Sequence, residues 1–401
     1  MNDTSILRKY SAEVETELNN ILNFWAARMP DQKHNGFIGR IGGDNQAYPE
    51  AAKGVVLNSR ILWTFSAAYL YNKNSTHLDL ADRAYDYITR YFIDSKYGGV
   101  YWMLNFEGKA TDETKQIYAQ AFALYALAEY CKTDTKAEVL AAALRLYELI
   151  ESKSFDEKYG GYIDAFTRDW QPVGDSRLSA KDAASKKTMN THLHLVEAYA
   201  NLYLVWPDAK LKSKIIHLLG NFTGHIIDHK TQHMGLYYNE QWKRSDNIIS
   251  YGHDIEAAWL LLEAAEIIKD EPLISTFKKV STALADSVLP GIADDGGLWY
   301  EKEGDHTNRE KHWWPQAEAM VGYLNAYELS KDERYLHKSI NTWQFVKKNL
   351  LDKSGEWYWG IDQNGKPMIA QDKAGPWKCP YHNGRACLEI IKRVRKITET
   401  K

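Results

Sequence analysis

A glycine followed by apolar and aromatic residues recurs six times along this 401-residue chain, and this repeat constrains the fold more than any other feature. Successive copies lie about 60 residues apart, with a longer interval between the third and the fourth, and such self-similarity indicates a repeat architecture. A glycine before a short alternating run is typical of a tight turn into a β-hairpin. The copies are HNGFIGRI (34–41), YGGVYWML (97–104), YGGYIDAF (159–166), HMGLYYNE (233–240), GGLWYEKE (296–303) and GEWYWGID (355–362).

Between these turns the apolar residues change to helical periodicity. Each interval holds two amphipathic stretches of about 15–20 residues, the length of ordinary globular helices. We therefore predict about twelve helices, at 5–28, 52–72, 76–93, 114–131, 136–152, 188–204, 209–227, 250–268, 274–288, 312–329, 333–350 and 379–396.

The two helices of each pair differ in composition. The helix after each glycine turn is apolar, as in YAQAFALYALAEY at 118–130, whereas its neighbour has a charged face, as in DLADRAYDYITRYF at 79–92. A buried inner ring inside an amphipathic outer ring accounts for this difference. We therefore predict an all-α fold, an (α/α)6 barrel with short β-hairpins between helix pairs, as a single domain over 1–401. The polar, lysine-rich loop at 169–187 is predicted to be a mobile lid.

The composition argues against several classes of partner. With 50 Lys and Arg against 53 Asp and Glu, the chain has no net charge that would attract nucleic acid or anionic membranes. No segment approaches the roughly 18 apolar residues of a membrane span, and the first residues lack the apolar stretch of a signal peptide. Three cysteines without metal-like spacing fit a reducing cytoplasm. We expect a cytoplasmic monomer with neither a nucleic-acid nor a membrane partner.

Polar residues cluster near the starts of the predicted inner helices. Asn190 and His194 are four residues apart and share a helix face, and His253, Glu256 and Trp259 lie along one broad face. Each alone has a structural explanation, such as a hydrogen-bonded core histidine or an N-cap. Their recurrence at the same end of alternate helices predicts one central cavity. The other candidates are Arg60, Tyr118, Trp314, Glu318, Trp377 and His382.

Common cofactor and metal signatures are absent from the sequence. His192 and His194 are two residues apart and point to different sides of a helix, so they cannot share a metal ion. There is no HExxH zinc motif, no GxGxxG or P-loop nucleotide motif, and no GxSxG nucleophile motif. We therefore expect neither a metal ion nor a cofactor. The 14 Trp and 26 Tyr against 11 Phe suit either core filling or the stacking and hydrogen bonding of a sugar.

Four segments resemble the N-acylglucosamine 2-epimerase superfamily and, within it, the cellobiose 2-epimerases. The resemblance runs along essentially the whole chain and implies an (α/α)6 barrel. It also implies an isomerase that inverts C2 of the reducing-end sugar of β-1,4-linked disaccharides, an oligosaccharide substrate, and no metal or redox cofactor. The segments are MNTHLHLVEAY (189–199), YGHDIEAAWLL (251–261), WWPQAEA (313–319) and GPWKCPYHNGR (375–385).

The resemblance places the essential histidines of the family on His194, His253 and His382. Inverting C2 requires ring opening, removal of the proton next to the carbonyl and its return to the other face, and two histidines suit these transfers. We expect His253 and His382 to be this pair, with Glu256 orienting His253. The implied substrate contacts are Arg60, Tyr118, Asn190, Glu256, Trp259, Trp314, Glu318 and Trp377.

Further roles follow from the chemistry of those residue types. Arg60 would stabilise the negative oxygen of an enediolate, His194 and Asn190 would assist ring opening, and the indole rings would stack on sugars. Three alternatives stay open. They are a monosaccharide or N-acetylhexosamine 2-epimerase or aldose–ketose isomerase, a non-catalytic sugar-binding protein, and an inverting glycosidase, whose two carboxylates lie about 6.5–9.5 Å apart.

Overall fold

The computed structural model describes residues 3–133, 137–178, 183 and 185–399, and twelve α-helices lie within them. The inner helices are α2 (Val55–Asn72), α4 (Ile117–Cys131), α6 (Met189–Val205), α8 (Tyr251–Ile267), α10 (Trp313–Ser330) and α12 (Tyr381–Glu399). The outer helices are α1 (Asp3–Arg28), α3 (Ser75–Tyr87), α5 (Ala137–Lys153), α7 (Ala209–Asn221), α9 (Glu271–Val288) and α11 (Glu333–Asn349).

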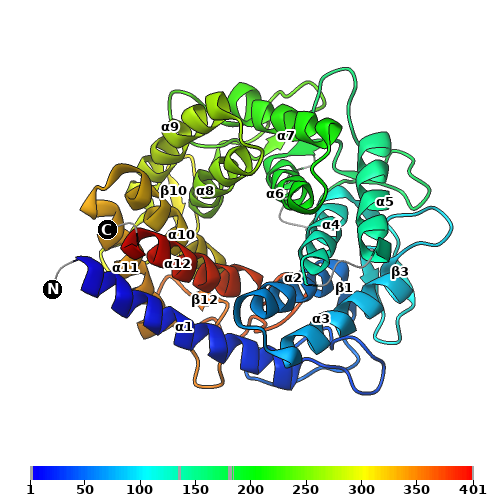
Figure 1. The fold of residues 1–401 in the computed structure, drawn as a ribbon, viewed down its shortest axis with the longest axis horizontal. Helices are drawn as coiled ribbons and strands as arrows, with labels where there is room; N and C mark the ends of the chain where they lie inside the picture. Colours follow the sequence, from blue (N-terminus) through cyan, green and yellow to red (C-terminus); the bar gives the residue numbers. More distant parts are fainter. Residues whose placement is uncertain (1–2, 134–136, 179–182, 184, 400–401) are drawn as a thin grey trace.

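The inner helices form a closed ring around the centre of the molecule (Figure 1). Each contacts the next in the order α2, α4, α6, α8, α10, α12, and α12 returns to α2. Each outer helix packs mainly against one inner helix, and α1 packs against α12, so that the two ends of the chain meet in the ring. The predicted (α/α)6 barrel is therefore confirmed.

Burial follows the difference in composition between the two rings. Every residue of α4 is buried, whereas α3 buries only one stripe of side chains and presents charged residues to solvent. Two predicted outer helices, 76–93 and 209–227, are α-helical only as far as Tyr87 and Asn221. Each continues as one π-helical turn, over Ile88–Phe92 and Phe222–Ile226, which a periodicity of 3.6 residues does not predict.

Short antiparallel sheets join neighbouring repeats at the end of the barrel where the inner helices begin. The strand before an inner helix pairs with the hairpin of the next repeat, as β1 pairs with β2 and β4 with β5. The strands are β1 (Lys53–Gly54), β2 (Met103–Leu104), β3 (Ala110–Asp112), β4 (Lys115–Gln116), β5 (Ala165–Phe166), β6 (Lys187–Thr188), β7 (Tyr237–Tyr238), β8 (Ile248–Ser250), β9 (Glu301–Glu303), β10 (His306–Asn308), β11 (Lys311–His312) and β12 (Gly360–Ile361).

The repeated glycines lie in the turns that lead from an outer helix into these hairpins. Gly161 has a φ of +75°, and a Cβ atom at this position would lie 2.3 Å from the Trp242 ring. Both the backbone conformation and the lack of space therefore require glycine. In the fourth copy the positive φ falls instead on Gln232, at +60°.

Buried lysines hold the starts of three inner helices in place. The Nζ atoms of Lys53, Lys115 and Lys187 lie 2.8, 3.0 and 2.7 Å from carboxylate oxygens of Asp31, Asp94 and Asp156, respectively. All three lysine side chains are completely buried. Each pair ties the strand before an inner helix to the preceding glycine turn, and a buried ion pair of this kind defines one arrangement of the chain.

No helix within the described residues is long and apolar enough to cross a membrane. In the loop predicted to be a mobile lid, 169–187, residues 179–182 and 184 lie outside the described part of the chain. Whether this loop moves stays a prediction.

Candidate active site

One cavity of about 580 Å³ lies at the end of the barrel where the inner helices begin, and we call it the front cavity. All six inner helices contribute side chains to its lining. It brings together nine of the eleven side chains predicted from the sequence. These are Arg60, Tyr118, Asn190, His194, His253, Glu256, Trp314, Trp377 and His382.

The three histidines of the front cavity are each held through Nδ1. His194 Nδ1 lies 3.0 Å from Glu197 Oε2. His253 Nδ1 lies 2.7 Å from the Ser250 hydroxyl, and His382 Nδ1 lies 2.7 Å from Glu318 Oε1. A partner on one ring nitrogen sets the tautomer and orientation of the ring, so the Nε2 atoms are left for a ligand in the cavity.

The Trp314 ring contacts both His253 and His382. Its centroid lies 4.7 Å from that of His253 and 5.7 Å from that of His382. Trp377 lies in the same cavity, with its ring centroid 6.2 Å from that of Tyr118. The two histidines come from different helices, α8 and α12, and both lie beside the Trp314 ring.

Burial keeps the cavity histidines neutral. It lowers the pKa of His253 to about 3, and the nearby His194 lowers it further. Burial likewise lowers the pKa of His194, and it lowers that of His382 together with the charges of Arg60 and Arg385. A neutral imidazole can accept a proton, so these side chains are suited to act as bases.

Four charged side chains form a cluster that contacts His194 and His382. We call them the arginine cluster, and they are Arg385, Glu197, Glu256 and Glu318. Arg385 Nη2 donates to one oxygen each of Glu256 and Glu318, at 2.7 Å in both cases. Its Nη1 donates to Glu197, and all four side chains are buried. Three carboxylates thus share one guanidinium, which also connects the supports of His194 and His382.

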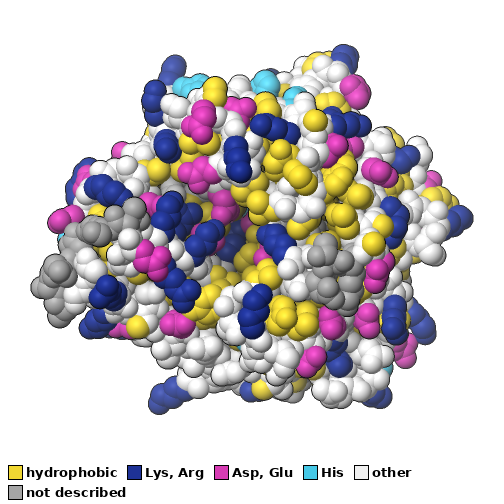
Figure 2. Space-filling model, viewed as in Figure 1, with side chains coloured by type: hydrophobic (Ala, Val, Ile, Leu, Met, Phe, Trp, Pro, Cys, Tyr) yellow, Lys and Arg dark blue, Asp and Glu magenta, His cyan; other side chains and the backbone are white. Residues whose placement is uncertain are grey.

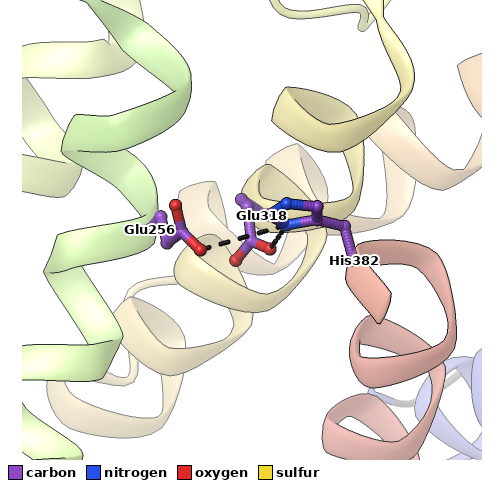
Figure 3. A group of neighbouring side chains, drawn as sticks. All are labelled: Glu256, Glu318 and His382. Carbon is purple, nitrogen blue, oxygen red and sulfur yellow. Dashed lines mark hydrogen bonds and ion pairs between the residues drawn. The ribbon is translucent and has the colours of Figure 1, made fainter. Parts of the chain in front are cut away.

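Glu256 faces His382 rather than His253, and this corrects the role predicted for it. Its Oε1 atom lies 3.9 Å from His382 Nδ1 (Figure 3). The hydrogen-bond donor to Glu256 is Arg385. The partner of His253 is Ser250 instead. Spacing along α8 places Glu256 and His253 near one another but does not show which of several inward neighbours Glu256 binds.

Trp259 and Glu318 lie behind the surface of the front cavity, where we had expected substrate contacts. Neither side chain is among the described residues that line the cavity. The Trp259 indole N–H donates to Glu318 Oε2 at 3.1 Å, while Glu318 Oε1 binds His382. Their geometry is that of residues that position His382.

The carboxylates of the cluster differ in their affinity for protons. Burial, together with Glu318, raises the pKa of Glu256 to about 8, and burial also raises that of Glu318. For Glu197, burial is outweighed by the charge of Arg385 and the hydrogen bond with His194, which lower its pKa to about 2. The group formed by Glu256, Glu318 and His382 therefore retains a proton at neutral pH.

The same three residues have the composition of a metal site. Ligand-type atoms of Glu256, Glu318 and His382 lie within 4.8 Å of one another (Figure 3). Carboxylate oxygens and an imidazole nitrogen are ligands that divalent cations use in proteins. The Arg385 guanidinium, however, already contacts both carboxylates, so a metal ion there would compete with a charge that the chain itself supplies.

Arg60 connects two other parts of the cavity wall. Its Nη2 donates to the Tyr118 hydroxyl at 2.8 Å, and its Nη1 donates to the Trp377 carbonyl at 3.3 Å. The Arg60 Nε atom is buried without a hydrogen-bond partner among the described residues. Arg60 therefore brings a fixed positive charge to the cavity.

Sequence reasoning missed Ser250, Glu197 and Arg385, which support the histidines, and Tyr381, whose hydroxyl donates to Glu197. Glu197 and Arg385 each follow a cavity histidine by three residues on the same helix. Residues three apart share a helix face, so this spacing could have identified both as neighbours of the histidines. His192, two residues before His194, lies outside the cavity. Its Nδ1 lies 2.7 Å from the Thr188 carbonyl, and its Nε2 accepts from the Tyr162 N–H at 3.0 Å.

The chain belongs to the N-acylglucosamine 2-epimerase (GlcNAc 2-epimerase) family, whose model matches residues 36–386. It is 46% identical over 383 residues to the cellobiose 2-epimerase of Bacteroides fragilis, covering 94% of this chain and 98% of that protein. It is 38% identical to the cellobiose 2-epimerase of Dictyoglomus turgidum, covering 97% and 100%. The solved cellobiose 2-epimerase of Bacillus thermoamylovorans superimposes with a TM-score of 0.93 at 39% identity, covering 96% of this chain and 100% of that one.

Proposed function

We propose that this protein catalyses the reversible 2-epimerisation of the reducing-end sugar of β-1,4-linked disaccharides, converting cellobiose to glucosyl-mannose. The observation that carries the proposal is the pair His253 and His382, which lie beside the Trp314 ring in one cavity and whose Nε2 atoms make no hydrogen bond to the described residues. The similarity to cellobiose 2-epimerases along nearly the whole chain supports the choice of substrate.

The first step is opening of the sugar ring. The O1 hydroxyl must lose a proton and the ring oxygen must gain one before an aldehyde exists. His194, which is hydrogen-bonded to Glu197, can exchange these protons, and Asn190 lies in the same cavity to bind a sugar oxygen. Glu197 remains ionised because its pKa is low, so it can stabilise His194 when that ring carries the proton.

The second step moves the proton at C2. One histidine removes it to give an enediolate, and the other returns a proton to the opposite face. Arg60, which lines the cavity, supplies the positive charge that stabilises the enediolate oxygen. No covalent intermediate with the protein is needed.

Both histidines begin a turnover neutral, and they differ in whether a group that holds a proton lies behind them. His253 is neutral and can accept the C2 proton, while the group of Glu256, Glu318 and His382 holds a proton that His382 can donate. After one turnover the positions of the protons are exchanged. The exchanged form is the one that acts on the opposite epimer, which accounts for a reversible reaction.

The size and lining of the front cavity support a disaccharide. A volume of about 580 Å³ lies within the range of about 300–1,000 Å³ that is typical of small-molecule sites. Trp314 and Trp377 offer two indole rings, one beside the histidines and one beside Tyr118. One ring can stack on the reacting sugar and the other on its neighbour.

An inverting glycosidase is disfavoured by the carboxylate geometry. Such an enzyme needs two carboxylates about 6.5–9.5 Å apart with a water molecule between them. Ligand-type oxygens of Glu256 and Glu318 lie within 4.8 Å, and Arg385 binds both. An aldose–ketose isomerase shares the first proton transfer with the proposed reaction and differs in returning the proton to C1.

We also propose that the protein acts in the cytoplasm and as a monomer. Its three cysteines are free and buried, as is typical of a reducing compartment.

The proposal is tested by incubating the protein with cellobiose, mannobiose, lactose, mannose and N-acetylglucosamine and identifying products by NMR. We expect cellobiose to give glucosyl-mannose, and mannobiose the corresponding gluco epimer. Conversion of only the monosaccharides would contradict the disaccharide assignment. Release of glucose from cellobiose would show a glycosidase, and a ketose as the only product would show an isomerase.

A further inference from the structure

The inner helices have different surroundings at the two ends of the barrel. At the end where they finish, a hollow lies in the middle of the face with acidic and basic side chains around it (Figure 2). At the end where they begin, each is preceded by a turn that an isolated β-bridge closes. His253 and His382 lie in the first turn of α8 and α12, so the β-bridged turns determine how these two residues are supported from outside the front cavity.

One position of the β-bridged turn differs between the six repeats. It directly precedes the second partner of each bridge, and we call it the turn position. The second partners are Phe37, Val100, Tyr162, Met234, Leu298 and Trp357. The residue at the turn position is glycine in the first, second, third and fifth repeats, but it is His233 in the fourth repeat and Glu356 in the sixth.

Glycine is required in four repeats because a side chain would not fit. A Cβ atom added at Gly36, Gly99, Gly161 and Gly297 would lie 2.5, 2.8, 2.3 and 2.8 Å, respectively, from the nearest side-chain atom. The fourth and sixth repeats accommodate a large polar side chain at the same position. These are the two repeats whose inner helices, α8 and α12, carry the pair of histidines proposed to move the C2 proton.

In the fourth repeat, the His233 ring binds the residue that directly follows His253. Its Nδ1 atom lies 2.7 Å from Asp254 Oδ2, and Asp254 Oδ1 accepts from the Met234 N–H at 3.0 Å. The Asp254 side chain is buried, and that of His233 is 14% exposed. Both oxygens of Asp254 therefore hold the first turn of α8 against the preceding turn.

In the sixth repeat, Glu356 binds the residue that directly follows His382. Asn383 Nδ2 donates to Glu356 Oε1 at 2.8 Å, and Lys378 Nζ donates to the same oxygen at 2.9 Å. All three of these side chains are buried. Glu356 therefore holds both α12 and the segment that leads into it, and the relation seen in the fourth repeat recurs here with different residue types.

The contacts at the turn position act on the histidines through the backbone. None of the side chains that form them is among the described residues that line the front cavity. Consecutive Cα atoms lie about 3.8 Å apart, so a shift of Asp254 or Asn383 moves the neighbouring histidine with it. The helix α6, whose His194 exchanges only hydroxyl protons in the proposed reaction, follows a turn with Gly161 instead.

We propose that His233 and Glu356 are positioning residues, which hold His253 and His382, respectively, at the separation that the C2 proton transfer needs. Two side chains that act on opposite faces of one carbon atom must keep a fixed separation, and a misplacement of about 1 Å costs about 10²-fold in rate. This inference rests on the proposed epimerase function.

The test compares the steady-state kinetics of cellobiose epimerisation in variants of the full-length protein. His233→Gly introduces the residue found in four repeats, and Asn383→Ala removes the sixth-repeat contact but keeps the Glu356–Lys378 ion pair. We expect each to lower kcat about 10–100-fold with KM within about twofold, because the lining of the front cavity is unchanged. His233→Gln, which can still donate to Asp254, should recover most of the activity.

An isotope effect and two controls distinguish positioning from a loss of stability. Cellobiose deuterated at C2 should give both variants an isotope effect on kcat at least as large as that of the unmodified protein, because the C2 transfer itself is slowed. Circular dichroism checks the folding, and Asn383→Ser is the second variant of the sixth repeat if Asn383→Ala does not fold. His229→Ala and Lys353→Ala, exposed residues of the same two turns, should behave as the unmodified protein.

Three results would overturn the proposal. They are a kcat within twofold of the unmodified protein in both repeats, a rise in KM without a fall in kcat, and a smaller isotope effect than in the unmodified protein. A loss in one repeat alone would remove the role of the other residue. An unmodified protein that converts no reducing sugar would instead contradict the proposed epimerase function, and this inference with it.

Discussion

Two walls of the front cavity each present one histidine, but they hold it by different chemistry. The α8 wall carries His253, whose Nδ1 meets the neutral hydroxyl of Ser250 at 2.7 Å. The wall formed by α10 and α12 carries His382, whose Nδ1 meets the Glu318 carboxylate at the same distance. Glu318 is bound in turn to Arg385, whereas no charged side chain of the described residues is hydrogen-bonded to the Ser250 hydroxyl apart from His253 itself.

Because of this difference, the support of His382 retains a proton at neutral pH, whereas the support of His253 does not. A hydroxyl orients His253 without adding charge, so burial, helped by the nearby His194, keeps the pKa of the ring low and the ring neutral. The α10–α12 wall places several carboxylates around one guanidinium, and burial together with the excess negative charge raises the pKa values of Glu256 and Glu318, so that a proton is retained there. In the proposed reaction, His253 is thus the base and the group around His382 is the acid.

The largest expected effect is the loss of either histidine. General acid–base catalysis contributes about 10²–10⁴-fold, so His253→Ala and His382→Ala should each reduce kcat on cellobiose by about 10³-fold. Circular dichroism and thermal unfolding check that each variant folds. His337→Ala, an exposed histidine of α11, should retain the activity of the unmodified protein. Activity within tenfold of that protein in either cavity variant would break the two-histidine scheme.

Arg385 belongs to one wall only, and removing it should affect the stability of the fold. Arg385→Met leaves Glu197, Glu256 and Glu318 without their common cation, and breaking a buried ion pair costs about 3–5 kcal/mol. Urea unfolding measures this free energy, and Arg385→Lys should recover part of it. Arg334→Met, on the surface of α11, should change little. A loss below about 1 kcal/mol would show that the cluster does not need the guanidinium.

The supports of the two histidines should differ in importance. A hydrogen bond to a charged group contributes about 1.5–3 kcal/mol and a neutral one about 1 kcal/mol. Glu318→Gln should therefore lower kcat about 10–100-fold, and Ser250→Ala about fivefold. Steady-state kinetics on cellobiose distinguishes the two. Equal losses would mean that the charge of the α10–α12 wall has no role in proton transfer.

The pH profile of kcat/KM should report the stored proton. Because the pKa of Glu256 is about 8, its group loses the proton as the pH rises through 8, and activity should fall there. The low pKa of His253 keeps the base neutral well below pH 6, so activity should stay flat from pH 7 down to that region. Glu256→Gln removes a negative charge and should move the basic limb down by about one unit. An unchanged basic limb would exclude this cluster as the acid.

The fold was predictable because its signals are local. Helical periodicity and the contrast between the apolar stretch at 118–130 and the charged stretch at 79–92 indicate two rings without knowledge of any contact. The buried lysines Lys53, Lys115 and Lys187 were missed, because a single lysine in a polar segment is usually exposed.

The convergence of site residues was also predictable, but their connections were not. Arg385 and its partner Glu197 are 188 residues apart, and only the closed ring brings them together. The spacing of His253 and Glu256 suggested a pair, yet the ring gives Glu256 a stronger partner in Arg385. Local spacing identifies which side chains point inward and leaves open which of them bind one another.

The most direct test of the two-histidine account is the reaction of cellobiose in D₂O followed by NMR. A histidine that donates to C2 exchanges its proton with solvent, so the glucosyl-mannose formed first should carry deuterium at C2 and lack the C2 proton signal. The unreacted cellobiose should keep its C2 proton early in the reaction. Glucosyl-mannose that retains protium at C2 from the first turnover would contradict the account.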